Sequence, residues 1–143
     1  MAITQLSVYL ENKPGTLSDV INIMSEAGIN IRALSLADTQ EFGILRVIVS
    51  DVEKTKEILE GTALCVKTQV VAVKMADEAG ALNKILTALD KENINIEYMY
   101  AFTSTVSGSA YVVFRLDDVV HGEEVLNKNG QVTLSDEDLS EIL

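Results

Sequence analysis

The spacing of apolar residues changes from period two to a helical period near the amino terminus. Residues 6–10 alternate Leu, Val and Leu with Ser and Tyr, which predicts a strand with one buried face. Apolar residues then recur between Leu17 and Met24 at i, i+3, i+4 and i+7, which predicts an amphipathic helix. Pro14 suits the first helical position and Gly28 suits the stop.

The alternating pattern returns after this helix and completes a recognisable unit. Strands are predicted over 29–36 and 45–49, with a polar turn at 38–41 between them. Residues 51–61 read as a second helix with Asp51 as its cap and Gly61 as its stop, and a fourth strand begins at Leu64. The predicted order of elements is therefore βαββαβ.

The whole pattern occurs twice. A shift of 65 residues superimposes Gly15 on Gly80 and the segment 29–31 on 94–96, and it places apolar residues on the buried positions of the first copy. We therefore predict two domains, residues 1–67 and residues 68–143, the second ending in a strand at 131–134 and a short C-terminal helix. The fold class is α+β, with two ferredoxin-like sandwiches in tandem, each with a four-stranded antiparallel sheet.

The composition of the chain limits the kinds of molecule that it can bind. The chain is 48% hydrophobic with 23% charged residues, as expected of a folded protein, and its formal net charge is -11. Such a balance opposes binding to nucleic acid or to an anionic membrane surface, because both require clustered basic residues. The sequence shows no signal-peptide pattern and no apolar run long enough to span a membrane, and it holds one cysteine, so we expect a cytoplasmic protein.

Catalytic and metal-binding patterns are absent from the sequence. The only histidine, His121, is far in sequence from Cys65, and we interpret both as structural. The acidic groups at 117–118 and 136–138 lack the ligand spacing of a calcium loop, and helix capping explains them better. We predict no catalytic residues, no metal site, no cofactor and no enzymatic activity.

The turn at residues 12–17 has chemistry suited to a small anion. A glycine-containing turn that opens directly into a helix presents unpaired N–H groups at the positive end of the helix dipole, where a carboxylate binds well. Asn12 adds an amide with donors and an acceptor, and Asn30 begins the neighbouring strand. The alternative is that Pro14 and Gly15 merely start a helix.

The pattern Glu11 to Leu17 followed by Ala27 to Ile31, found twice in a βαββαβ frame, resembles the ACT domain family of small-molecule regulatory modules. The resemblance implies that the domains pack side by side and that a free amino acid binds at their interface, beside the first turn. It also resembles the serine-binding ACT domain of phosphoglycerate dehydrogenase, in which two asparagines at the positions of Asn12 and Asn30 touch the effector. The histidine of that domain is replaced by Leu10 here.

The resemblance implies ligand-binding residues in both copies: Leu10, Asn12, Lys13, Pro14, Gly15, Thr16, Leu17 and Asn30 in the first, and Met75, Asp77, Ala79, Gly80, Ala81, Leu82 and Asn95 in the second. Because Asp77 replaces Asn12 and would repel a ligand carboxylate, the two sites should differ.

We therefore expect a non-catalytic amino-acid sensor made of two ACT domains that acts by allosteric regulation. Its partners would be a free amino acid, further copies in a homo-oligomer and a regulated enzyme. The alternative is an interaction module that binds no ligand and uses its sheet edges to hold a protein.

Overall fold

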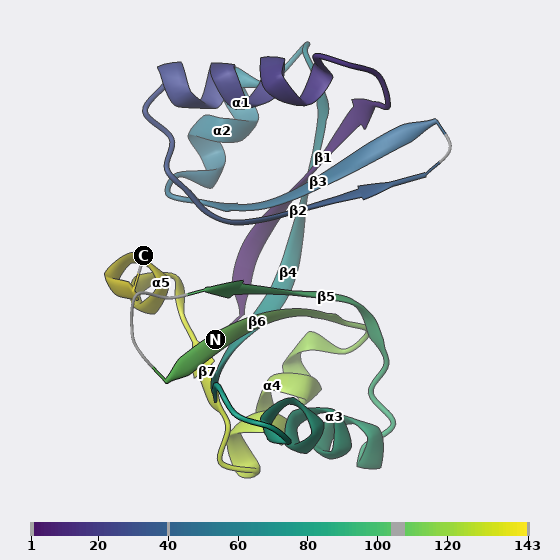
Figure 1. The fold of residues 1–143 in the computed structure, drawn as a ribbon, viewed down its shortest axis with the longest axis vertical. Helices are drawn as coiled ribbons and strands as arrows, with labels where there is room; N and C mark the ends of the chain where they lie inside the picture. The colour runs from purple at the N-terminus through teal and green to yellow at the C-terminus, as the bar shows by residue number, and fades with distance from the viewer. Residues whose placement is uncertain (1, 40, 104–107, 143) are drawn as a thin grey trace. The chain divides into compact units, whose positions relative to one another are not determined.

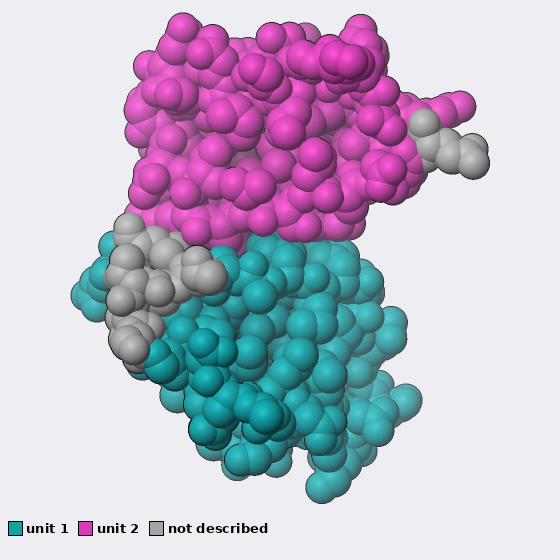
Figure 2. Space-filling view, viewed as in Figure 1, with its two compact units in different colours: residues 1–3, 69–143 teal, residues 4–68 magenta. Residues whose placement is uncertain are grey.

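The computed structural model describes residues 2–39, 41–103 and 108–142. The chain forms two compact units, which Figure 2 colours separately. Residues 4–68, in magenta, are called the first unit here in the order of the chain, and residues 1–3 with 69–143, in teal, are called the second unit. The domain boundary predicted between residues 67 and 68 stays a prediction. The fold class is confirmed, because each unit follows the βαββαβ order.

The first unit is an antiparallel sheet with two helices on one face (Figure 1). Its elements are β1 (Ile3–Glu11), α1 (Thr16–Glu26), β2 (Ile31–Asp38), β3 (Phe42–Val49), α2 (Val52–Ile58) and the beginning of β4 (Leu64–Ala76). The strands lie in the order β2-β3-β1-β4. Leu6 lies opposite Val47 and Val8 opposite Leu45, so these side chains share the face that the helices cover.

The second unit repeats this plan with α3 and α4 on one face of its sheet (Figure 1). It contains the rest of β4, α3 (Ala81–Lys91), β5 (Ile96–Thr103), β6 (Ser109–Leu116), α4 (Val119–Lys128), β7 (Val132–Leu134) and the additional helix α5 (Asp136–Ile142). The strands lie in the order β7-β4-β6-β5. A register shift occurs at Ile31/Ala33 in β2 and at the equivalent Ile96/Tyr98 in β5, so even this irregularity repeats.

Each unit has its own apolar core. In the first unit the buried cluster joins β1, β3 and α1 through Leu6, Met24 and Leu45, which are completely buried. In the second unit the corresponding cluster includes Val73, Leu89 and Phe114. Each such side chain contributes about 1.5–3 kcal/mol when it is fully buried, so these clusters stabilise the scaffold from which the turns project.

Candidate functional site

The first turn joins β1 to α1 through residues 12–15. Gly15 is the N-cap of α1 with a φ of 92°, in the left-handed region that glycine enters without strain, and no side chain caps the helix. The prediction that Pro14 occupies the first helical position is wrong, because the helix begins at Thr16. Pro14 lies in the turn, and the left-handed Gly15 separates it from the helical backbone.

A hydroxyl group and two backbone contacts hold this turn. Thr16 donates from Oγ1 to the carbonyl oxygen of Glu11 at 2.7 Å and lies 3.0 Å from that of Lys13. The N–H of Asn12 donates to the carbonyl of Glu41 at 3.3 Å, and that of Asp19 to Gly15 at 2.9 Å. Thr16 therefore stabilises the turn rather than offering its hydroxyl freely to a ligand.

The beginning of α1 keeps unpaired donors. Within the described parts of the chain, the N–H groups of Leu17 and Ser18 have no hydrogen-bond partner, and the exposed side-chain amide of Asn12 has none either. These N–H groups point out of the helix at its positive end, which favours an anion such as a carboxylate.

An ion pair balances the charge of the turn. Lys13 Nζ lies 2.9 Å from Glu11 Oε2, and both side chains are mostly exposed. The hydrogen bond from Lys13, together with its charge, lowers the pKa of Glu11, and Glu11 raises the pKa of Lys13 in the same way. The pair neutralises a carboxylate that would otherwise repel a bound carboxylate.

A cavity of about 400 Å³ adjoins the turn. Of the predicted site residues, it is lined by Leu10, Lys13 and Thr16. Sequence reasoning missed the other lining residues, which come from β1, α1, the start of β3 and the loop before β4: Tyr9, Glu11, Asp19, Val20, Phe42, Thr62, Ala63 and Leu64. Phe42 reaches the cavity because it lies opposite Glu11 in the β1–β3 pair, a register that the sequence pattern does not show.

Asn30 lies away from this cavity. It is exposed immediately before β2, and its backbone N–H donates to Ser50 Oγ at 3.0 Å. It lines a different cavity, of about 490 Å³, with residues at the C-terminal end of α1. Because α1 has eleven residues, about 15 Å of helix separates this end from the turn with Asn12. The structure therefore does not bring the two asparagines of the first unit together.

The second turn has the same backbone as the first. Gly80 is the N-cap of α3 with a φ of 87°, the N–H of Asp77 donates to Gly108, and that of Lys84 donates to Gly80. Asp77, Ala79 and Gly80 are exposed, Met75 is half-buried against the core, and Ala81 and Leu82 begin the helix. The turn carries the carboxylates of Asp77 and Glu78 in place of an amide and an ammonium group.

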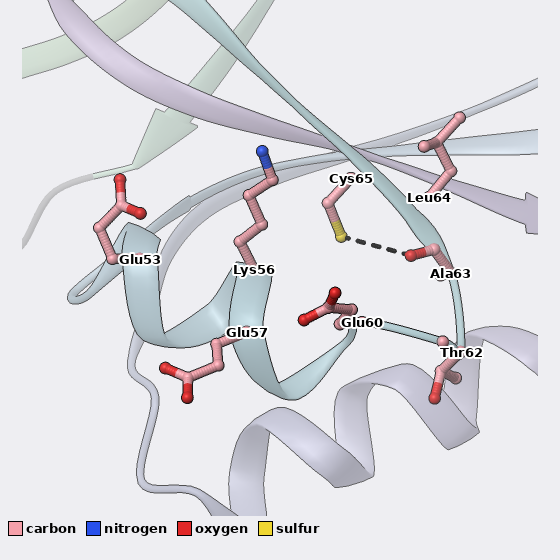
Figure 3. Close-up of a pocket in the computed structure, with 9 residues that line it drawn as sticks. Glu53, Lys56, Glu57, Glu60, Thr62, Ala63, Leu64 and Cys65 are labelled. Carbon is pink, nitrogen blue, oxygen red and sulfur yellow. Dashed lines mark hydrogen bonds between the residues drawn. The ribbon is translucent and has the colours of Figure 1, made fainter.

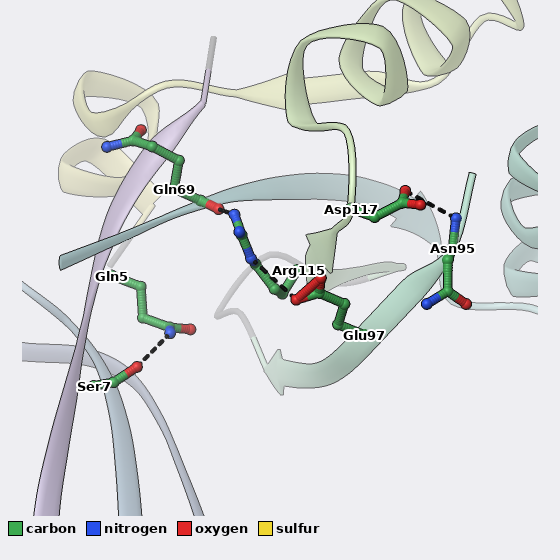
Figure 4. Close-up of polar contacts among 7 residues, drawn as sticks. All are labelled: Gln5, Ser7, Gln69, Asn95, Glu97, Arg115 and Asp117. Carbon is green, nitrogen blue, oxygen red and sulfur yellow. Dashed lines mark hydrogen bonds and ion pairs between the residues drawn. The ribbon is translucent and has the colours of Figure 1, made fainter. Parts of the chain in front are cut away.

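Asn95 repeats the place of Asn30. Its N–H donates to Asp117 Oδ1 at 3.0 Å, and the N–H of Asp117 donates back to its carbonyl at 3.1 Å (Figure 4). Asn95 lines a cavity of about 420 Å³ whose residues include the equivalents of all those that line the cavity at Asn30 except Gly28. This flank of the unit is therefore duplicated more faithfully than the turns are.

A larger cavity, of about 740 Å³, lies between α2 and the beginning of β4. Cys65 is buried there with Sγ directed to the carbonyl of Ala63, as Figure 3 shows. Burial raises the pKa of the Cys65 thiol, which disfavours the reactive thiolate. His121 Nε2 lies 3.8 Å from Glu92 Oε2 in the second unit, whereas Cys65 belongs to the first.

No set of three or more His, Cys, Asp or Glu side chains is arranged to hold a metal ion within residues 2–39, 41–103 and 108–142. In the same residues, no helix is both long and apolar enough to cross a bilayer.

Comparison with known proteins identifies relatives over the whole chain. A family model described as an ACT domain pair matches residues 1–143. The acetolactate synthase small subunit of Haemophilus influenzae is 27% identical over 132 residues, or 91% of this chain and 74% of that protein. The isozyme 3 small subunit of Escherichia coli acetolactate synthase is 42% identical over 57 residues, or 38% of this chain and 35% of that protein.

Solved structures agree with this relationship. A protein of Bacteroides thetaiotaomicron has a TM-score of 0.91 at 38% identity, covering 97% of this chain and 96% of that one. The ligand-free regulatory subunit of aspartate kinase from Thermus thermophilus has a TM-score of 0.65 at 14% identity, covering 88% and 91%. At this identity the aspartate kinase subunit shows a shared fold only.

Proposed function

The chain belongs to the ACT domain pair family, and on this premise we propose that it is a non-catalytic module that binds a free amino acid and regulates a partner protein. The observation that carries the proposal is the first turn. It combines unpaired N–H groups at the start of α1, the unpartnered amide of Asn12 and an adjoining cavity of about 400 Å³.

The carboxylate and the side chain of an amino acid both have complementary groups at this turn. The carboxylate accepts from the N–H groups of Leu17 and Ser18 and from the Asn12 amide. The cavity takes the side chain, and because Leu10, Val20 and Leu64 line it, we expect an apolar or aromatic amino acid. The ion pair of Glu11 and Lys13 leaves Asp19 as the remaining charged side chain among the residues that line the cavity.

Asn30 could contact the proposed ligand only if it came from a second ACT unit. One amino acid is much shorter than the length of helix between Asn12 and Asn30 of the same unit. A ligand that touches both positions therefore lies at an interface between units, as the family resemblance implies. We propose that homo-oligomer formation, or the other half of the pair, supplies the second wall.

The partner is proposed from the relatives. Two of them are named as small subunits of acetolactate synthase. We propose that this chain likewise associates with a larger enzyme subunit, and that the bound amino acid changes the stability of that association. Such coupling commonly amounts to about 1–3 kcal/mol.

The test begins with protein purified without dialysis, whose mass under native conditions shows any retained amino acid. Calorimetric titration with each proteinogenic amino acid then gives an affinity. Asn12→Ala should weaken binding about tenfold, because it removes a hydrogen bond to a charged group. Asn22→Ala, an exposed substitution on α1, is the matched control. Absence of binding by every amino acid, or equal affinity in the Asn12→Ala variant, contradicts the proposal.

A ligand-free interaction module is the second candidate, and the free edge of β2 favours it. Leu34 and Leu36 lie on the core face, opposite Val47 and Leu45, yet are 54% and 52% exposed. Under this alternative, Leu34→Lys would abolish association measured by sedimentation, and a thermal shift would respond to a protein partner but to no amino acid.

A further inference from the structure

The first unit has a second open edge, at the beginning of β4. This strand follows β1 at the end of the row β2-β3-β1-β4, and its described pairings with β6 and β7 begin only at Val71 and Ala72. Leu64 and Val66 on this segment are 66% and 41% exposed. An edge strand with exposed apolar side chains is a template for pairing with another extended chain.

A groove follows this edge on the side of the helices. The cavity of about 740 Å³ lies between α2 and the segment 61–65. Its helical wall consists of Glu53, Lys56, Glu57 and Glu60, whose spacing places them on one face of α2 and its final turn. Figure 3 shows Glu60 at the end of the helix, before the chain turns toward Thr62 and β4.

The groove is acidic, with three carboxylates and one lysine among its lining residues. Glu53 forms an ion pair with Lys67 of β4. Glu57 and Glu60 are exposed, and neither has an ion-pair partner within the described residues. Lys56 is the one cation among the lining residues. A cationic partner therefore gains attraction here that a neutral or acidic partner does not.

We propose that the groove between α2 and residues 64–68 binds an extended, basic segment of a partner protein, which adds to the edge of β4 as a further strand. Backbone hydrogen bonds to β4 provide affinity, and alternate side chains provide specificity. One set of alternate side chains is apolar and lies beside Leu64 and Val66, and the other is Lys or Arg and reaches Glu57 and Glu60.

The charge of the chain argues against a second copy as the occupant. With a formal net charge of -11, another molecule brings more negative charge to an acidic groove. The proposal does not depend on amino-acid binding, because the strand edge and the carboxylates that it uses lie outside the turn at residues 12–17. The loop of Thr62, Ala63 and Leu64 lines both this cavity and the cavity at the first turn, so the two occupants would contact a common segment.

The test uses the full chain and an array of seven-residue peptides in which Lys or Arg alternates with Val, Ile, Leu or Phe. A matched array carries Glu at each basic position. Fluorescence anisotropy measures affinity. The variant Glu57→Lys/Glu60→Lys reverses two exposed charges of the groove, and Glu26→Lys/Glu124→Lys makes the same change in net charge on exposed positions elsewhere.

We expect basic peptides to bind and acidic ones not to bind. The Glu57→Lys/Glu60→Lys variant should bind roughly tenfold more weakly while the control matches the wild type, and added salt should weaken binding. Hydrogen exchange should slow at residues 64–68 in the complex. The proposal is overturned if no basic peptide binds, if both variants lose affinity equally, or if protection appears elsewhere. Calorimetry with amino acids on the same variants tests the function of the turn separately.

Discussion

The two turns of this protein share one backbone and differ in nearly every side chain that a ligand would meet. Gly15 and Gly80 both adopt a left-handed conformation before a helix, and Asn12 and Asp77 both donate an N–H to the neighbouring loop. The first turn nevertheless carries an amide, while the second carries carboxylates. The fold constrains the backbone of both turns, whereas the side chains of the two turns differ, as expected if only the first binds the proposed ligand.

The largest expected effect comes from giving the first turn the charge of the second. Asn12→Asp would place a carboxylate beside the proposed ligand carboxylate, and the repulsion between two charges 4 Å apart is about 4 kcal/mol at an effective dielectric of 20. We expect amino-acid affinity measured by calorimetry to fall by at least about tenfold after solvent screening.

Two further variants sharpen this comparison. Asn22→Asp makes the same charge change on the exposed surface of α1 and should leave the affinity unchanged. Asp77→Asn gives the second turn the amide of the first and should not weaken binding at the first. If Asn12→Asp binds as tightly as the wild type, the carboxylate does not lie at this turn.

Much of the fold was predictable because it repeats. Several core positions related by 65 residues are buried in both units, as Met24 and Leu89 show, whereas β3 and β6 are related by 67 residues, because Val47 pairs with Leu6 and Phe114 with Val71. Period-two patterns predicted the strands. Gly15 and Gly80 lie immediately before the two helices, and both adopt a left-handed conformation that glycine enters without strain. The position of Pro14 was assigned wrongly, because sequence alone does not show that a left-handed residue follows it, and the helix predicted over 51–61 is the shorter Val52–Ile58.

The site was less predictable, because its walls come from distant segments. Phe42 and Leu64 reach the cavity at the first turn only through strand pairing and the return of the chain after α2. Thr16 was named as a ligand contact, yet the structure directs its hydroxyl to Glu11. Local pattern indicates which residues begin a helix but not which of their hydrogen bonds the fold already uses.

The helices that follow β3 and β6 differ in the size of the side chain that they pack against the strand. A shift of 67 residues relates Thr55, completely buried in α2, to Gly122 in α4, and Val49 to Leu116. A Cβ at Gly122 would lie 2.3 Å from Leu116 Cδ1, so the Leu116 side chain would have to move to accept it. We expect Gly122→Ala to lower the free energy of unfolding by about 1–3 kcal/mol in urea denaturation.

Rescue distinguishes overpacking from other causes. Gly122→Ala with Leu116→Val copies the smaller strand residue of the first unit and should recover most of the lost stability. Glu124→Ala on the exposed face of α4 should change stability by less than about 0.5 kcal/mol. If the double variant is no more stable than Gly122→Ala, the contact with Leu116 is not the cause.

The hydroxyl of Thr16 gives a smaller difference between the turns, because its equivalent is Ala81. Thr16→Ala removes a side-chain hydrogen bond to the Glu11 carbonyl and should cost about 1 kcal/mol in chemical denaturation. Hydrogen exchange should accelerate at residues 12–15 and remain unchanged at residues 77–80. The exposed substitution Ser18→Ala on α1 serves as the control. Equal exchange in Thr16→Ala and wild type would mean that the turn is held by its backbone alone.

The smallest expected effect concerns α5, which has no counterpart in the first unit. Asp138 Oδ2 accepts from the N–H of Ser135 at 2.8 Å and from its hydroxyl, and these hydrogen bonds lower the pKa of Asp138. Because the folded-state pKa is lowered, the contribution to stability is complete above the unfolded value of about 3.9 and is lost as the pH falls through the folded value. Amide signals of α5 in an NMR titration should therefore shift only as the pH falls below the ordinary range of an aspartate. In Asp138→Asn this change should disappear, and its persistence would assign the transition to Asp136 or Glu137 instead.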